Sequence, residues 1–367
     1  MAMGKYDDQI RQIEEELGKM QYNKRTQHHY GLLRAKLARL KESQLARSGV
    51  GKASGKGYSV KKSGSASVIL IGFPSAGKST LLNVLTDADS PVGAYEFTTL
   101  DVVPGMMHYK HANIQILDVP GIVHGAASGR GRGKEVLAVM RNADLAIIIV
   151  DVHRPEQLAA LRKEIYDADL RLNQRPPDVK ITKTAKGGLH VASTVPLTKL
   201  AKETARAVQR EMGVHNADVV IRQDIDVDQF IDAIEGNRAY LPSITVLNKI
   251  DAVDAEKLRA VVSKIKPDLC ISAQKGTNID KLRDLIYDKL GLIRVYCKEV
   301  GRKADLDVPL IIKKGSTIRT VCEKLHRDFA SKFKFARVWG PSAKFGGQKL
   351  MLRHEVKDGD IVEIHVR

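Results

Sequence analysis

The chain is poor in cysteine, in aromatic residues and in long apolar runs. Its three cysteines (Cys270, Cys297, Cys322) show no CxxC spacing, which argues against a disulfide scaffold and a thiolate metal site. The longest apolar run, Leu145–Val150, is far shorter than the roughly 20 residues that a bilayer-spanning helix needs. The N-terminus mixes acidic and basic residues and lacks the apolar core of a secretory signal. We therefore expect a soluble protein of a reducing, intracellular compartment without membrane contact.

Hydrophobic residues are not scarce. They make up 43% of the 367 residues, and this content excludes wholesale disorder. At roughly 150 residues per domain, the length predicts two or three domains. The scaling of surface with mass predicts that about 75% of the surface can be buried, so we expect a sizeable core.

Acidic residues are too few to balance the basic ones, and the imbalance lies at the two ends. The net charge is +17, of which residues 1–64 and 292–367 carry +8 each and residues 65–291 only +1. Lysine and arginine near phosphates release counterions, so basic ends suit a polyanionic partner. A positive surface can also serve solubility alone. The asymmetry favours RNA or a ribosome as the partner of both ends.

Apolar residues at three- and four-residue spacing predict two N-terminal helices that pair as a hairpin over residues 1–47. The apolar positions are Ile10, Ile13, Leu17 and Met20 in the first helix (7–22) and Tyr30, Leu33, Leu37 and Leu40 in the second (27–46). Residues 48–65 are rich in Gly, Ser and Lys and lack this periodicity, which predicts a mobile linker. Its lysines either touch phosphates or are simply solvated.

Strand-length apolar runs alternate with helical patterns over residues 66–291. This alternation predicts an α/β fold with a mostly parallel sheet and helices on both faces. The predicted strands are SVILIGF (67–73), Ile114–Asp118, Leu145–Asp151, Ile244–Asn248 and Leu269–Ser272. The predicted helices between them are Lys78–Leu85, Glu135–Arg141 and Ala255–Ile265.

The interval between the strands that end at Asp151 and begin at Ile244 is too long for a simple crossover. It holds a predicted helix over 156–172, a possible hairpin with a Gly-Gly turn over 179–194, a long helix over 197–212 and a short one over 227–234. We expect an inserted α+β subdomain at residues 176–243, in which acidic and basic residues balance.

Residues 292–367 predict a small α+β domain in which one helix crosses a sheet. The expected elements are strands at 293–298, 308–313, 336–339 and 361–366 and a helix over 318–329. For RNA contact we expect Lys313, Lys314, Lys332 and Lys334, with Phe333, Phe335 and Trp339 available for stacking on bases. The alternative is that these alternating aromatic residues form the core of the small sheet.

The segment GFPSAGKST (72–80) matches the phosphate-binding loop pattern G-x-x-x-x-G-K-[ST] between a predicted strand and a predicted helix. Glycines let backbone N–H groups close around phosphates, and the start of the helix adds its positive dipole end. Lys78 is expected to reach the β- and γ-phosphates, and Ser79 to place its hydroxyl on Mg²⁺.

The segment NKID (248–251), also at a strand end, predicts which base is bound. A carboxylate at Asp251 can accept two hydrogen bonds from guanine N1–H and its exocyclic amine, whereas adenine offers no such pair. Asn248 and Lys249 are expected to hold the loops and cover the base. SAQKG (272–276) is expected to offer backbone N–H groups to the guanine carbonyl oxygen. ATP binding is the disfavoured alternative.

Two further segments predict contacts to the γ-phosphate and the metal. In DVPG (118–121), Asp118 is placed to hold Mg²⁺ through water, and Gly121 to bring its N–H to the γ-phosphate. In FTTL (97–100), a threonine can swing onto Mg²⁺, with Thr99 preferred over Thr98. Lys78, Thr99 and Gly121 are thus the expected catalytic residues. The residues expected to bind GTP are Gly72, Phe73, Pro74, Ser75, Ala76, Gly77, Lys78, Ser79, Thr80, Phe97, Thr98, Thr99, Asp118, Gly121, Asn248, Lys249, Asp251, Ser272, Ala273 and Gln274.

Together these segments resemble the developmentally regulated GTP-binding proteins, a branch of the Obg-like GTPases. The resemblance rests on GFPSAGKS (72–79), YEFTTLDVVPG (95–105), DVPGIVHGAASGRGRGKEV (118–136), NKID and SAQKG, and it runs the length of the chain. It implies an insertion like domain 2 of ribosomal protein S5 and a C-terminal β-grasp domain of the TGS type. It also implies a cytoplasmic GTPase associated with RNA, ribosomes and translation, with a dedicated regulatory partner protein.

The residue that positions the catalytic water is the open point. Ras-like enzymes have a glutamine directly after the DxxG glycine, whereas this chain has Ile122, which cannot form a hydrogen bond through its side chain. We therefore expect slow intrinsic hydrolysis. Either K⁺ or an arginine (Arg130 or Arg132) could complete the catalytic site. The K⁺-stimulated relatives carry an asparagine where this chain has Ser75. His124 is expected to be a surface residue.

The sequence leaves two alternatives to a GTPase switch: a phosphotransferase that uses the same loop, and an RNA-binding module with a non-hydrolysing nucleotide site. The base-reading segments disfavour the first. The intact Lys78, Ser79, Thr99 and Asp118 disfavour the second. No dimer seam is evident, so we expect a monomer.

Overall fold

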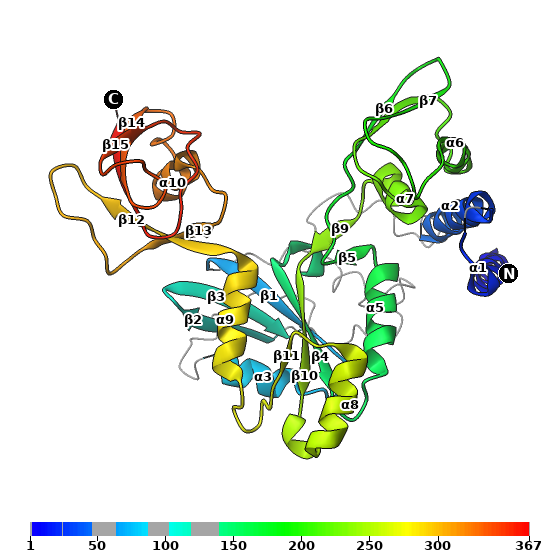
Figure 1. The fold of residues 1–367 in the computed structure, drawn as a ribbon, viewed down its shortest axis with the longest axis horizontal. Coiled ribbons are helices and arrows are strands. Elements are labelled where there is room, and N and C mark those ends of the chain that lie inside the picture. The colour runs from blue at the N-terminus through cyan, green and yellow to red at the C-terminus, as the bar shows by residue number, and fades with distance from the viewer. Residues whose placement is uncertain (1, 24, 46–63, 87–102, 119–138, 367) are drawn as a thin grey trace. The chain divides into compact units, whose positions relative to one another are not determined.

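The computed structural model describes residues 2–23, 25–45, 64–86, 103–118 and 139–366. The chain divides into two compact units (Figure 1). The sheet unit comprises Tyr58–Ala168 and Leu241–Arg367, and the insert unit comprises Met1–Gly57 and Asp169–Tyr240. The predicted linker at 48–65 lies almost entirely outside the described residues.

A six-stranded sheet forms the centre of the sheet unit, in the order β11–β10–β4–β1–β3–β2. The strands are β1 (Ala66–Ile71), β2 (Val103–Tyr109), β3 (Ala112–Asp118), β4 (Leu145–Asp151), β10 (Ser243–Asn248) and β11 (Leu269–Cys270). All neighbours pair in parallel except β2, which is antiparallel to β3. Strands β1, β4 and β10 are buried along their whole length, as expected of parallel strands covered on both faces.

Helices cover both faces of this sheet (Figure 1). They are α3 (Lys78–Leu85), α5 (Gln157–Asp167), α8 (Ala255–Ile265) and α9 (Ile279–Leu290), with the short 3₁₀ helix η2 at Ile250–Ala252. Alternate strand residues such as Val68 and Ile147 share one core with Leu81 of α3 and Leu282 of α9. The bounds predicted for α3 and α8 are confirmed. The predicted helix 135–141 lies mostly outside the described residues.

The C-terminal part of the sheet unit is a five-stranded sheet in the order β13–β12–β16–β14–β15. Its elements are β12 (Leu292–Lys298), β13 (Leu310–Lys313), α10 (Ile318–Leu325), β14 (Phe333–Trp339), β15 (Gln348–Leu350) and β16 (Asp360–Val366). Helix α10 packs on one face, where Ile318 and Val321 join Val295, Ala336 and Val362 in a buried core. The predicted small α+β domain is confirmed, with the helix ending four residues earlier than expected.

The insert unit holds a three-stranded sheet in the order β6–β8–β7 with two helices. Its elements are β6 (Val179–Lys183), β7 (Leu189–Ser193), α6 (Lys202–Glu211), β8 (Ala217–Ile221) and α7 (Val227–Glu235). The hairpin predicted over 179–194 is wrong. Strands β6 and β7 do not pair with each other, because β8 lies between them, antiparallel to β6 and parallel to β7. The alternating apolar residues of β8 complete the core, and the sequence analysis had not assigned that strand.

The N-terminal helices α1 (Ala2–Lys19) and α2 (Gln27–Leu45) form the predicted hairpin, with Ile13, Leu33 and Leu37 buried between them. Ala35 of α2 also joins the core of the inserted residues. The Gln27 side-chain amide donates to the Lys199 carbonyl oxygen and accepts from the Ala201 N–H. The hairpin and the inserted residues are therefore parts of one compact unit.

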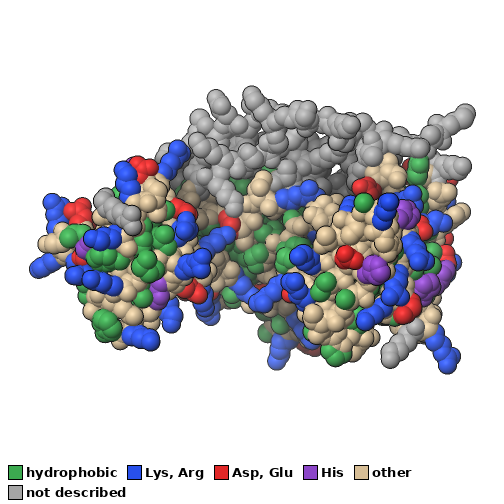
Figure 2. Space-filling view, turned by 90° about the horizontal axis from the view of Figure 1, so that it is seen from above, with side chains coloured by type: hydrophobic (Ala, Val, Ile, Leu, Met, Phe, Trp, Pro, Cys, Tyr) green, Lys and Arg blue, Asp and Glu red, His purple; other side chains and the backbone are tan. Residues whose placement is uncertain are grey.

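Part of the basic character of the N-terminus is engaged within the chain. Arg34 pairs with Asp228 at 2.5 Å, Lys41 pairs with Glu14 at 3.0 Å, and Arg39 donates to the Glu211 carbonyl oxygen at 3.1 Å. On the face drawn in Figure 2, Lys and Arg side chains are spread widely among hydrophobic and uncharged groups. The positive charge of the N-terminal hairpin is thus only partly free for a partner.

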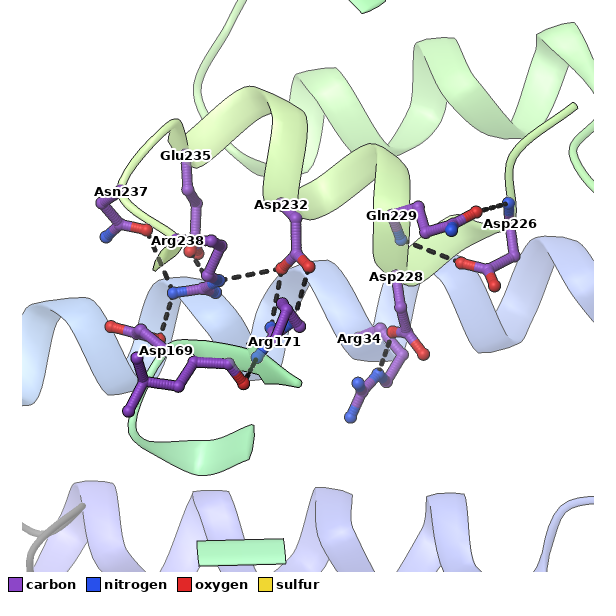
Figure 3. A network of polar contacts seen from close by, with 11 residues as sticks. Arg34, Asp169, Arg171, Asp226, Asp228, Gln229, Asp232, Glu235, Asn237 and Arg238 are labelled. Carbon is purple, nitrogen blue, oxygen red and sulfur yellow. Dashed lines mark hydrogen bonds and ion pairs between the residues drawn. The ribbon is translucent and has the colours of Figure 1, made fainter. Parts of the chain in front are cut away.

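A buried ionic network lies where the chain enters and leaves the insert unit (Figure 3). Asp232 of α7 accepts from Arg171 Nε at 2.6 Å, Arg171 Nη2 at 2.7 Å and Arg238 Nε at 2.8 Å. Arg238 also pairs with Asp169 and Glu235. Burial raises the pKa of Glu235, and the Arg238 guanidinium opposes that rise. The network joins α7 to the two short strands through which the chain enters and leaves, β5 (Leu170–Leu172) and β9 (Ala239–Leu241).

The borders of this region differ from those predicted. The compact unit begins at Asp169 and ends at Tyr240, whereas we predicted an insertion at 176–243. The predicted helix 156–172 ends at Asp167, because Asp169 adopts a left-handed φ of 65° and the next residues pair as β5. The predicted helix 197–212 begins only at Lys202. None of the described helices has an apolar stretch long enough to cross a bilayer.

Candidate functional site

The loop after β1 is shaped by two glycines that admit no side chain. A Cβ on Gly72 would lie 2.7 Å from the Ile149 carbonyl oxygen. Gly77 has a φ of 93°, and a Cβ there would lie 2.3 Å from Asn248 Nδ2. Ser75 also takes a left-handed φ, of 63°. The loop thus curls over the carboxyl end of the sheet and leads directly into α3, the geometry that suits a phosphate.

Lys78 lies inside the curl of this loop. Its Nζ donates to the carbonyl oxygens of Gly72 and Phe73, each at 3.1 Å. Burial lowers the pKa of Lys78, while the Asp118 carboxylate opposes that shift. A positive charge held over the loop by weak neutral acceptors is available to an anion that enters it.

Ser79 and Asp118 meet beside the first turn of α3. The Ser79 hydroxyl donates to Asp118 Oδ2 at 2.8 Å. Asp118, at the end of β3, is only 6% exposed, and no described residue forms a hydrogen bond with its buried Oδ1. Buried polar atoms are nearly always paired, so this oxygen points to a missing partner. A hydroxyl and a carboxylate are the hard oxygen donors that Mg²⁺ prefers, and this pair fits that ion.

Asn248 ties the phosphate loop to the loop after β11. Its Nδ2 donates to the Ala76 carbonyl oxygen at 3.0 Å, and its Oδ1 accepts from the Ala273 N–H at 3.0 Å. The side chain is buried, at 2% exposure. One residue therefore fixes the spacing of the two loops that the sequence assigned to opposite ends of a nucleotide.

Lys249 is held by a residue that the sequence analysis did not select. Its Nζ donates to Asp151 Oδ2 at 2.8 Å, while Asp151 Oδ1 accepts from the His153 N–H at 2.9 Å. Burial tends to raise the pKa of Asp151, but the bonds from Lys249 and His153 outweigh it and hold the pKa below its usual value. The position of Asp151 at the end of β4 was the available signal, because β4 and β10 are adjacent strands.

Asp251 lies in η2, partly exposed, on the same loop as Lys249. The Ser272 hydroxyl forms a hydrogen bond with its carboxylate and lowers its pKa, so Asp251 is an ionised acceptor at neutral pH. Ser272 and Ala273 are buried, whereas Gln274 is exposed. The carboxylate and the loop after β11 thus lie together at the carboxyl edge of the sheet, where α/β folds bind ligands.

The structure brings together most of the predicted site. Pro74, Ser75 and Thr80 are exposed around the loop, and Phe73 is half-buried. The predicted residues Phe97, Thr98, Thr99 and Gly121, as well as Ile122, His124, Arg130 and Arg132, lie outside the described residues. The described site therefore contains the loop after β1, the Ser79–Asp118 pair and the loops after β10 and β11.

Three family models match the chain in consecutive segments. Residues 67–183 match the 50S ribosome-binding GTPase model, residues 186–292 match the C-terminal region of that domain, and residues 293–366 match the TGS domain.

Full-length relatives agree with these matches. An uncharacterised GTP-binding protein of Methanocaldococcus jannaschii is 52% identical over 98% of this chain and 93% of its own length. Developmentally-regulated G-protein 3 of Arabidopsis thaliana is 43% identical over 97% of each chain. Developmentally-regulated GTP-binding protein 2 of Bos taurus is 41% identical over 97% of this chain and 98% of its own.

Proposed function

Because the chain belongs to the developmentally regulated GTP-binding protein family of GTPases, we propose that it is a GTP-operated switch that acts on ribosomes during translation. The observation that carries this proposal is the Asn248 side chain, which holds the phosphate loop and the base-reading loop at a fixed spacing. A rigid link of this kind suits a ligand with a base at one end and phosphates at the other.

In this proposal Asp251 selects guanine. Its ionised carboxylate would accept from N1–H and the exocyclic amine, and Lys249 would cover the ring. The Ala273 N–H already donates to Asn248 Oδ1, so the exposed Gln274 would offer its backbone N–H to the base carbonyl. Adenine would leave the carboxylate unpaired, which costs much of the binding free energy. Asp151 keeps Lys249 in place through the 2.8 Å bond between them.

We propose that Ser79 and Asp118 hold Mg²⁺, Asp118 through water, with Thr99 joining when GTP is bound. The orphaned Asp118 Oδ1 supports this assignment. When bound, the ion would neutralise charge on the phosphates. Lys78 would move from the two loop carbonyls to the γ-phosphate, and the Gly121 N–H would donate to the same group. The segments around Thr99 and Gly121 would relax after hydrolysis, which is how a bound phosphate becomes a conformational signal.

Hydrolysis is proposed to be slow in the isolated protein. Ile122 occupies the position of the water-orienting glutamine and offers no hydrogen bond. Either K⁺ or an arginine, Arg130 or Arg132, would supply the missing assistance to hydrolysis. The ribosomal role is supported by the match of residues 67–183 to a ribosome-binding GTPase model and by the basic ends of the chain. We place this activity in the cytoplasm, in a monomer assisted by a regulatory partner protein.

The test is GTP turnover by the full chain with and without ribosomes, each in K⁺ and in Na⁺. We expect slow turnover alone and acceleration by ribosomes. Replacement of Ile122 by Gln should raise the intrinsic rate, with Ile122→Leu as the size-matched control. A K⁺ requirement would select the ion route, and loss of turnover in Arg130→Ala or Arg132→Ala would select the arginine route. A GTP turnover rate that ribosomes do not change would contradict the proposed action on ribosomes.

A further inference from the structure

The five-stranded C-terminal sheet has one face without a helix. Helix α10 packs against the side chains of Val295, Ala336, Val338 and Val362 on the other face. Side chains alternate along a strand, so their neighbours in sequence point to the free face. Phe333 packs with the α10 core, which removes it from the residues expected to stack on RNA.

A row of charged side chains crosses this free face. Register pairs Lys298 of β12 with Glu363 of β16, Glu363 with Arg337 of β14, and Arg337 with Lys349 of β15. Residues paired in register lie side by side on the same face. Four adjacent strands therefore present three cations and one carboxylate in a single line.

The carboxylate in this row is an anchor rather than a surface charge. Glu363 is 3% exposed, pairs with Lys298, and accepts from His365 Nε2 at 2.7 Å. Burial would raise the pKa of Glu363, but the bonds from Lys298 and His365 outweigh it and lower the pKa. Arg337 and Lys349, by contrast, are exposed. Neither takes part in an ion pair within the described residues.

Rings flank the row on both sides. Phe335 pairs in register with His365 and stacks on it, with ring centroids 4.3 Å apart and planes 20° apart. On the other side, Trp339 is paired with Ile361, which is in turn paired with Tyr296. Lysine ammonium groups lie over two of these rings, Lys349 at 4.9 Å from Phe335 and Lys298 at 4.8 Å from Trp339. Along β14 the face thus presents the ring of Phe335, the cation of Arg337 and the ring of Trp339 at every second residue.

We propose that this ring–cation face (Tyr296, Lys298, Phe335, Arg337, Trp339 and Lys349) binds single-stranded RNA. Arg337 and Lys349 would contact the phosphates, with Lys349 turning away from Phe335, while Lys298 stays paired with Glu363. Unstacked bases would lie against the half-buried rings of Phe335 and Trp339. A double helix hides its bases and cannot use the rings. Other expected contacts are less free, because Lys313 pairs with Asp144 at 2.6 Å and Lys332 with Asp328 at 3.9 Å. This inference rests on the proposed ribosomal function and deepens it.

The test measures fluorescence anisotropy of a labelled single-stranded oligouridylate of about 12 nucleotides with the full-length protein. The double variant Arg337→Glu, Lys349→Glu should bind about tenfold or more weakly and lower the salt slope by roughly 1.4. Phe335→Leu should weaken binding about fivefold or more with an unchanged salt slope. The matched control is Arg319→Glu, Arg327→Glu, which makes the same charge change at two exposed positions, within α10 and two residues after it.

The outcomes separate this inference from the function on which it rests. Wild-type affinity for RNA with selective losses in the face variants and unchanged GTP turnover supports the inference. Equal loss in the control pair, or tighter binding of a duplex, would overturn it as non-specific charge attraction. Loss of ribosome binding without loss of RNA affinity would assign the face to a ribosomal protein instead. No RNA binding by the wild type, with ribosome-stimulated turnover intact, would overturn the inference and leave the GTPase proposal standing.

Discussion

In the proposed function, Asp251 is the residue that recognises the base. The bond from Ser272 lowers the pKa of its carboxylate, which stays ionised and can offer two acceptors to guanine. Replacement of Asp251 by Asn presents one acceptor and one donor. We expect about 100-fold weaker GTP binding and a gain for xanthosine triphosphate, whose second carbonyl can accept from the amide. Isothermal calorimetry with both nucleotides measures the exchange.

Glu256→Gln, an exposed carboxylate in the first turn of α8, is the control for Asp251→Asn and should bind GTP normally. An Asp251→Asn protein that still prefers GTP over ATP and xanthosine triphosphate would remove Asp251 from base recognition.

At this scale the motifs predicted which residues lie together better than the bonds they form. The spacing of the motifs placed Lys78, Ser79 and Asp118 in one site, and the structure brings them together. The bonds of Asn248 to Ala76 and Ala273 could not be predicted, because they join three loops that only the folded sheet brings together. The Lys249–Asp151 pair was not predicted for the same reason, because its partners lie 98 positions apart in the sequence.

A second residue-scale prediction concerns pH. The pKa of Glu363 is lowered on folding, so its ion pair stabilises the C-terminal domain fully above the ordinary glutamate pKa. That stabilisation is lost as the pH falls through the folded-state value. We expect urea midpoints to fall more steeply in the wild type than in Glu363→Gln as the pH drops below the ordinary glutamate pKa of about 4.3.

The single tryptophan, Trp339, lies in this domain and reports its unfolding by fluorescence. Glu299→Gln, an exposed carboxylate paired with Arg302 in the same domain, serves as the control and should keep the wild-type slope. Identical pH profiles for the wild type and Glu363→Gln would rule out this role for Glu363.

Among the elements, local patterns predicted those whose neighbours along the chain are also their neighbours in space. Helices α3 and α8 begin and end where apolar spacing placed them. The predicted pairing of β6 with β7 was wrong because β8 lies between them. Strand β8 begins 24 residues after β7 ends, beyond helix α6. A Gly-Gly turn between two apolar runs predicts a hairpin, but it cannot reveal a third strand that takes the place between them.

The network on α7 gives a prediction at the element scale. Asp232 serves both Arg171 and Arg238 and is 5% exposed. Asp232→Asn removes the charge that both buried guanidinium groups share, and we expect about 3 kcal/mol of lost stability in the insert unit. Hydrogen exchange of amides in α7, β5 and β9 would show this loss locally.

Asp228→Asn is the matched control in the same helix. Its pair with Arg34 is half-exposed, at 31% and 22%, so the expected loss is below about 1 kcal/mol. Equal losses in the two variants would show that the buried network adds no more stability than a surface pair.

For the whole molecule, the two basic ends differ more than their equal net charge suggests. The N-terminal hairpin uses Arg34, Arg39 and Lys41 to pack on its own chain. The C-terminal sheet leaves Arg337 and Lys349 exposed beside aromatic rings. We therefore expect the C-terminal end to account for most of the salt-sensitive contact with RNA. The bound nucleotide is expected to control when the protein associates with the ribosome.

The most direct test of a GTP-operated switch is co-sedimentation of the full chain with cognate ribosomes in the presence of a non-hydrolysable GTP analogue, GDP or the corresponding ATP analogue. We predict that the GTP analogue increases the bound fraction over both GDP and the ATP analogue. Equal binding in all three would show that the nucleotide does not control the association, and the switch would be contradicted.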